Sequence, residues 1–190
     1  MKRFFTTAAL IAGVMSAMAF ETYDEAFLAG KDAAAKKNYR AAVSAYNEAF
    51  EKAAANPRKI AAKQAEGAAY FLMRKFPESV AAYKAVLVLP GLTDGELEQA
   101  TYMYAHTLQM VKQYPESEKV LSEAVKNDKF KKFELYDIYV NCMVMQIKFD
   151  EAGKLLDVME KTAKNPNELK RVKAKRENVK KRQEQQAKTK

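Results

Sequence analysis

The 190-residue chain contains no tryptophan, only one cysteine, one histidine and six glycines. A single cysteine excludes an intrachain disulfide. The one histidine, His106, excludes a multi-histidine metal site, and no G-x-S-x-G motif accompanies it as a hydrolase would require. A glycine-rich phosphate-binding loop is also missing. We therefore expect a protein that is not an enzyme and has no metal, cofactor or catalytic residues. A weak enzyme built around His106 is a remote alternative.

The residues that are present predict an almost entirely helical domain. Long stretches rich in Ala, Glu, Lys and Leu contain few helix-breaking residues. A hydrophobic fraction of 48% and a charged fraction of 30% are typical of a globular chain. Cys142 lies among Tyr139, Val140 and Met143, so we interpret its thiol as a small buried apolar group. A reactive or intermolecular role is the alternative.

Residues 1–19 have the pattern of a secretory signal peptide. Lys2 and Arg3 precede an uncharged apolar run that ends in Ala17-Met18-Ala19, which is the order of a basic region, an apolar region and a cleavage site. We expect a mature chain that starts near Phe20 and is periplasmic or secreted. The alternative is a retained N-terminal anchor. No cysteine is available at the cleavage site for a lipid anchor.

Four aromatic residues, Tyr39, Phe76, Tyr114 and Phe149, recur 37, 38 and 35 residues apart. Residues three positions after them are small, those seven and ten positions after are apolar, and three of the four that lie nine positions before are small. Offsets of 0, 3, 7 and 10 follow one face of a helix. A repeat of this length is typical of a helical-repeat array.

Each repeat reads as a hairpin of two helices. Pro77 and Pro115 fit the first turn of a second helix, where a missing N–H leaves no backbone bond unmade. Three sites are expected to cap helix starts: Asn56 before Pro57, Thr93 with Glu96, and Asn165-Pro166 with Glu168. The predicted first helices are 22–36, 58–73, 95–111 and 133–147, and the second helices are 39–55, 77–89, 115–127 and 150–163.

This pattern resembles the tetratricopeptide repeat family over residues 22–163. The residues that carry the resemblance are Gly30, Tyr39, Ala42, Tyr46, Ala49 and Phe50 in the first unit, Gly67, Tyr70, Phe76, Tyr83 and Leu87 in the second, Tyr114, Ser117 and Ala124 in the third, and Phe149, Ala152 and Leu156 in the fourth. The family's tryptophan is missing and its terminal proline is displaced. The resemblance implies an all-α solenoid of four hairpins in residues 20–163, followed by a basic capping helix and tail in residues 164–190.

The resemblance also implies a concave groove, lined by the first helices, that holds a peptide or protein segment. The family's groove positions fall on Lys31, Gln64, Phe71, Gln99, Tyr102, His106, Gln109 and Asn141, together with Ala68, Asp137 and Met145. An ordinary solvated helix face is the alternative for the whole set. For His106, a role as a switch competes with an incidental position.

Positive charge is concentrated at the C-terminus. The net charge is +9, and residues 164–190 hold eleven Lys or Arg against three Glu. One interpretation is a helix that caps the last hairpin, with Leu169, Val172 and Val179 as its apolar stripe. The other is an arm that contacts an anionic lipid or envelope polymer. The residues of that arm would be Lys170, Arg171, Lys173, Lys175, Arg176, Lys180, Lys181 and Arg182.

These observations predict a non-enzymatic scaffold or adaptor that is exported to the cell envelope and binds a protein or peptide partner. The rival hypothesis is an anionic-surface binder that acts through the basic C-terminal helix. We expect no nucleic-acid partner, because the chain is predicted to be exported and no aromatic residues alternate with the basic ones in the tail. The sequence predicts neither the partner's identity nor an oligomeric state.

Overall fold

A computed structural model describes residues 20–130 and 132–188. The predicted signal peptide, residues 1–19, lies outside the described residues. About 80% of the described residues are helical and none of them forms a strand, which confirms the predicted all-α class. No helix within the described ranges is both long enough and apolar enough to span a bilayer.

Nine helices form within the described ranges, and their bounds lie within a few residues of those predicted. They are α1 (Tyr23–Ala35), α2 (Tyr39–Lys52), α3 (Asn56–Leu72), α4 (Phe76–Leu87), α5 (Asp94–Met110), α6 (Tyr114–Ala124), α7 (Lys132–Met145), α8 (Phe149–Thr162) and α9 (Pro166–Ala187). Each helix packs against the next one in the chain. In addition, α1 contacts α3 and α5 contacts α7, so odd-numbered helices are also neighbours.

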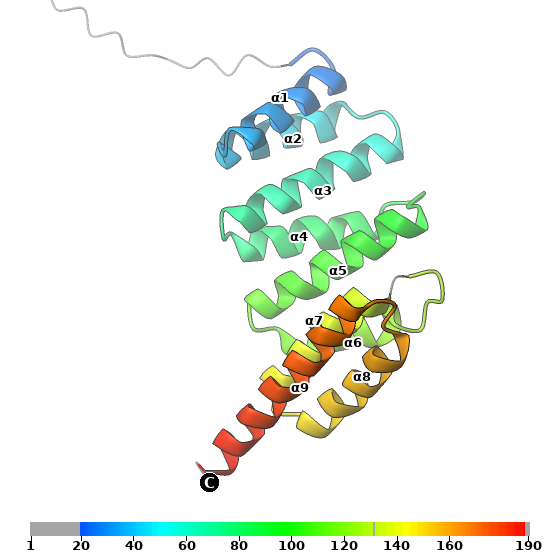
Figure 1. The fold of residues 1–190 in the computed structure, drawn as a ribbon. Coiled ribbons are helices and arrows are strands. Elements are labelled where there is room, and N and C mark those ends of the chain that lie inside the picture. Colours follow the sequence, from blue (N-terminus) through cyan, green and yellow to red (C-terminus); the bar gives the residue numbers. More distant parts are fainter. Residues whose placement is uncertain (1–19, 131, 189–190) are drawn as a thin grey trace, which may run out of the picture.

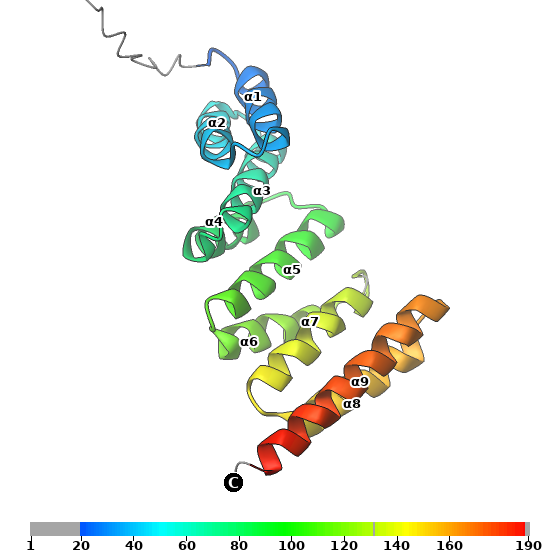
Figure 2. The ribbon, with the colours of Figure 1, turned by 60° about the vertical axis from the view of Figure 1, so that its left-hand side comes forward.

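The turns lie along two opposite edges of the row of helices (Figures 1 and 2). One edge holds the turns that join α1 to α2, α3 to α4, α5 to α6 and α7 to α8. The other edge holds the turns that join each of these pairs to the following helix. We call the first the tip edge, and we call the side of the row formed by α1, α3, α5 and α7 the first-helix face.

Local residues account for most helix starts. The Thr93 hydroxyl accepts from Glu96 N, while the Glu96 carboxylate accepts from Thr93 N at 2.9 Å, which is the predicted capping box. Asn165 Oδ1 accepts from Glu168 N at 2.9 Å, also as predicted. Asn56 does not cap: α3 begins at Asn56 itself, Ala55 is the N-cap residue, and no side chain bonds there.

Pro77 and Pro115 occupy the first turns of α4 and α6, as predicted. Two residues after each of them comes a buried serine whose hydroxyl bonds back to the preceding helix. Ser79 Oγ donates to the Gly67 carbonyl and Ser117 Oγ donates to the Ala105 carbonyl, both at 2.9 Å. The repeated Pro-Glu-Ser segment therefore marks the same helix-to-helix contact in two hairpins.

The core changes character along the row. In the first two hairpins, Gly30 lies against the ring of Tyr46, and Gly67 lies against the ring of Tyr83. Further along, a single large cluster of aliphatic side chains spans the third and fourth hairpins and α9. Its members include Leu121, Leu135, Ile138, Met143, Leu156, Met159, Val172 and Val179.

Cys142 belongs to this C-terminal cluster and is fully buried, as predicted. Its thiol donates to the Tyr114 carbonyl at 3.3 Å. Burial disfavours the thiolate and raises the pKa of Cys142. These observations fit a structural thiol rather than a reactive one.

Candidate functional site

The first-helix face carries a cluster of half-buried aromatic rings at its centre. The ring of His106 in α5 lies 5.3 Å from that of Phe71 in α3 and 6.0 Å from that of Tyr102 one turn earlier, measured between centroids. Phe71 also meets Phe76 edge-on at 5.5 Å. The structure therefore brings together three of the predicted groove residues, from two different helices.

Burial sets the ionisation of this cluster. Removal from water disfavours the imidazolium and lowers the pKa of His106. The same effect, together with the negative charges of Glu134 and Asp137, raises the pKa of Tyr102. Both rings are therefore uncharged near neutral pH, and the cluster presents an apolar surface with one hydroxyl and one imidazole.

A cavity of about 560 Å³ lies beside Tyr102, between α5 and the start of α7. Gly95, Glu98, Gln99 and Tyr102 line it from α5, with Lys129, Glu134 and Leu135 on the other side. Two predicted groove residues, Gln99 and Tyr102, thus border the same hollow. Its walls combine apolar surface with the amide of Gln99 and the carboxylates of Glu98 and Glu134. A cavity of this composition suits a polar side chain of a partner segment that is otherwise apolar.

Gln109 does not belong to the open face. Only 8% of this residue is exposed. Its Nε2 donates to Ser117 Oγ at 3.1 Å and to the Ile138 carbonyl at 3.0 Å. The side chain turns inward because these two acceptors, on α6 and α7, satisfy its amide. Gln109 therefore links three helices and offers little to a ligand.

The other predicted groove residues are dispersed. Lys31 is exposed on α1 and lies outside the aromatic cluster. Gln64 Nε2 donates to the Glu96 carbonyl at 3.3 Å and so bridges α3 to α5. Asn141 is exposed, but its Oδ1 accepts from Lys175 Nζ at 2.7 Å, which ties it to α9. The open part of the predicted site is therefore its middle, on α3 and α5.

Helix α9 lies across the last hairpin and uses many of its charges there. Arg171 makes a bidentate bond to Glu134 at 2.7 and 2.9 Å, which lowers the pKa of Glu134. Lys175 Nζ lies 3.3 Å from Asp137 Oδ1 without making a hydrogen bond to that buried atom, but it donates to the Asp137 carbonyl at 3.1 Å. These contacts tie α9 to α7.

The remaining predicted anionic-contact residues divide into two groups. Arg176 reaches Asp157 and Glu160 of α8 at 2.9 Å, Lys181 pairs with Glu177 at 2.7 Å, and Arg182 lies 3.7 Å from Met145 Sδ. In contrast, the side chains of Lys170, Lys173 and Lys180 are exposed and have no ion-pair partner among residues 20–130 and 132–188. The helix is therefore partly neutralised by its own fold.

Two exposed apolar residues, Leu72 and Met110, were missed by the sequence analysis. They end α3 and α5, and they occupy the same repeat position as Met145, four residues before the aromatic of each unit. This repeat position could have been found in the sequence from the same spacing that located the four aromatic residues.

Comparison with protein-family models and with curated proteins finds no match for the chain. Within the described residues, no group of His, Cys, Asp and Glu has the arrangement of a metal site. The description of the site therefore rests on its geometry.

Proposed function

We propose that residues 20–163 form four tetratricopeptide-like hairpins and that this array is a non-enzymatic scaffold for an extended protein segment. The support is the set of repeat columns, together with helices that follow one another in a single row (Figure 1). In arrays of this kind, one face is extended and open along its length. The partner would be a protein or peptide, and we propose no cofactor.

The observation that carries the proposal is the aromatic cluster beside the cavity of about 560 Å³ on α5. Phe71, Tyr102 and His106 keep part of their rings at the surface, although neighbouring residues of the same helices are buried. Aromatic side chains that stay half-exposed around a hollow are characteristic of sites where one protein anchors another.

We assign α9 the role of a capping helix for the array. Val172 and Val179 are buried in the C-terminal cluster, whereas Leu169, the third residue of the predicted stripe, is more than one-third exposed. Ion pairs to α7 and α8 hold the rest of the helix down. A terminal helix that covers the last apolar face is what a repeat array requires for solubility.

The proposed location is the cell envelope, and it rests on residues 1–19 alone. A second candidate function, binding of an anionic envelope polymer or lipid through α9, is favoured by Lys170, Lys173 and Lys180. These three cations are exposed and unpaired in the described part of the chain. They are the part of the tail that the fold does not use.

The test is a pull-down of the exported protein from its own cell envelope. We expect Phe71→Ala with Tyr102→Ala to lose the bound partner, and Lys170→Gln, Lys173→Gln and Lys180→Gln together to retain it. We substitute the charges of α9 and do not delete the helix, because a deletion would also remove Val172 and Val179 from the core.

The control variant combines Lys84→Ala and Lys119→Ala, on the second helices α4 and α6 and not on the first-helix face, and it should retain the partner. Thermal melts of every variant separate loss of binding from loss of folding. If only the α9 variant lost its partner, the scaffold proposal would give way to the anionic-surface binder.

A further inference from the structure

The four turns of the tip edge share an unfavourable backbone conformation. In each, one residue has a positive φ: Lys37 at 59°, Arg74 at 59°, Lys112 at 62° and Ile147 at 65°. Glycine adopts this region freely, whereas side chains with a Cβ atom are strained there, β-branched ones most of all. The chain thus places three cations and an isoleucine where glycine would be more stable. Each of these residues closes a helix C-cap in which the following backbone N–H bonds back to the helix, and this conformation leaves the side chain at the surface.

An exposed apolar side chain lies two residues before three of these positions. The exposed fractions are 57% for Leu72, 42% for Met110 and 47% for Met145, and Ile147 itself is 57% exposed. Lys37, Arg74 and Lys112 are exposed too, and none has an ion-pair partner in the ranges that the structure describes. Apolar and cationic side chains therefore alternate along the tip edge.

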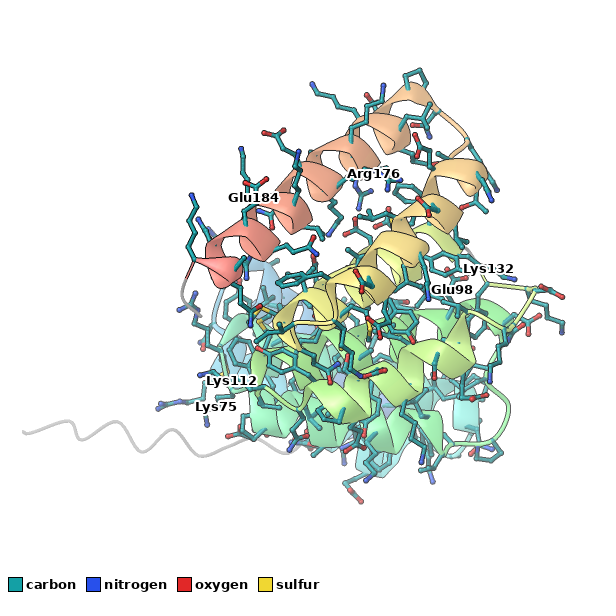
Figure 3. The ribbon with its side chains drawn as sticks, turned by 90° about the horizontal axis from the view of Figure 1, so that it is seen from below. Lys75, Glu98, Lys112, Lys132, Arg176 and Glu184 are labelled. Carbon is teal, nitrogen blue, oxygen red and sulfur yellow. The ribbon has the colours of Figure 1, made fainter. Side chains whose placement is uncertain are left out.

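The turns of the tip edge lie on one flank of the molecule. In Figure 3, Lys75 and Lys112, from two successive turns, both lie on this flank, while Glu98 and Lys132 lie on the opposite flank. The C-terminal end of α9 reaches the same edge (Figure 1). There Arg182 borders a small hollow with Met145 and Ile147. The row of turns is therefore extended by a cation from α9.

We infer that the tip edge binds the surface of an anionic lipid bilayer, with its apolar side chains at the acyl boundary and its cations on lipid phosphates. Exposed apolar residues next to Lys and Arg are the pattern of interfacial binding. A bilayer is a better occupant than a protein partner because Leu72 and Met110 are exposed two residues before the unpaired cations Arg74 and Lys112, so that apolar and cationic groups repeat along the edge. The inference is independent of the first-helix face.

The test measures binding of the exported protein to vesicles of equal parts phosphatidylglycerol and phosphatidylcholine. The main variant combines Lys37→Gly, Arg74→Gly and Lys112→Gly, which removes three charges and relieves backbone strain, so misfolding cannot explain a loss. Each cation near an anionic surface contributes about fivefold to affinity, and the triple variant should therefore bind about 100-fold more weakly. Leu72→Gln with Met110→Gln should also weaken binding.

The matched control is Lys84→Gln, Lys161→Gln and Lys164→Gln, which removes the same charge towards the far edge, outside the cations assigned to α9, and should change binding less than threefold. All proteins carry the same N-terminus, so any contribution of residues 1–19 cancels in the ratios. Three results would each overturn the inference: no binding to the anionic vesicles, equal losses in the glycine and control variants, or equally tight binding to soluble polyglutamate. The last would indicate an acidic polymer or protein as the ligand.

Discussion

The first two hairpins and the last two share the same repeat spacing, but the contact between the two helices of a hairpin is made by different residues. In the first two, a tyrosine ring of the second helix fills the space left by a glycine of the first. In the last two, a leucine takes the tyrosine's place and a larger residue replaces the glycine. The pairs are Gly30 with Tyr46, Gly67 with Tyr83, Ala105 with Leu121, and Val140 with Leu156.

We infer from this difference that the two positions compensate in size. A ring against glycine and a leucine against alanine or valine fill comparable space between the helices, which the close packing of protein interiors requires. Each of the two repeat positions therefore varies in residue type when it is taken alone. The combined size of the two residues varies less. The C-terminal hairpins look weaker by sequence pattern although their apolar cluster is the larger one.

The largest effect is expected from Gly30→Ala. A Cβ atom at Gly30 would lie 2.5 and 2.6 Å from two atoms of the Tyr46 ring. Because these contacts are so short, we take the upper end of the usual overpacking cost, about 3 kcal/mol. The helix-propensity gain of alanine offsets about 1 kcal/mol, so we expect a net loss of about 2 kcal/mol. Urea denaturation followed by circular dichroism measures it.

Two controls sharpen this test. At Gly67 the added atom would lie 3.0 to 3.2 Å from the Tyr83 ring, so Gly67→Ala should be close to neutral. Adding Tyr46→Leu to Gly30→Ala copies the third hairpin and should recover most of the loss. A neutral Gly30→Ala, or no recovery in the double variant, would show that the two columns do not compensate.

The next effect compares the two buried serines. Ser117 donates to a helix carbonyl and also accepts from Gln109, whereas Ser79 only donates. Ser117→Ala leaves a buried amide with one acceptor fewer, and we expect it to lower the free energy of unfolding by about 1.5 kcal/mol. Ser79→Ala should cost about 0.5 kcal/mol. Equal losses in the two variants would mean that Gln109 does not depend on Ser117.

A gain is expected from Ile147→Gly. The residue has φ of 65° and is mostly exposed, so glycine relieves strain and gives up little burial. We expect about 1 kcal/mol of added stability, and about 0.5 kcal/mol for Lys112→Gly, which is not β-branched. Thermal unfolding of both variants gives the ranking. A larger gain at Lys112 would contradict it.

The smallest effect is a difference in acid sensitivity. Burial raises the pKa of Glu118, but bonds from Lys148 at 2.6 Å and Gln146 at 2.9 Å outweigh it and lower that pKa overall. A depressed carboxyl pKa adds stability above its unfolded value of about 4.3, and that stability is lost as pH falls through the folded pKa. The C-terminal hairpins should therefore weaken first in acid.

Glu118→Gln checks this expectation. Its free energy of unfolding should fall less steeply than that of the wild type as the pH drops below about 4. Glu51→Gln, at an exposed position of α2, is the control and should follow the wild type. If the free energy of unfolding fell equally steeply with pH in Glu118→Gln and in the wild type, the bond between Glu118 and Lys148 would not be a source of acid sensitivity.

The helices could be predicted from the sequence because apolar spacing and caps are local properties. The groove positions implied by the family resemblance placed Phe71, Tyr102 and His106 on the surface of adjacent first helices. Gln109 was misplaced because its orientation depends on acceptors supplied by two other helices. Hydrogen bonds between distant helices cannot be predicted from the spacing of residues within one helix.

The role of α9 was likewise beyond local pattern. Its charges are visible in the sequence, but their partners on α7 and α8 lie 16 to 38 residues away. The uneven charge distribution therefore left a free basic arm open as the alternative to a capping helix. The ion pairs of Arg171 and Arg176 favour the cap. Asn56 failed as a cap for a simpler reason: α3 starts at Asn56, two residues before the predicted start at 58, so Asn56 is itself the first helical residue.

The most direct test of the central claim places a photo-crosslinking amino acid at position 102 of the protein in living cells. Tyr102 borders both the aromatic cluster and the cavity on α5. The account predicts crosslinks to a discrete protein from position 102 and none from position 119, on the outer helix α6. Crosslinks of equal yield from both positions, or none from position 102, would contradict the claim that the first-helix face binds a protein partner.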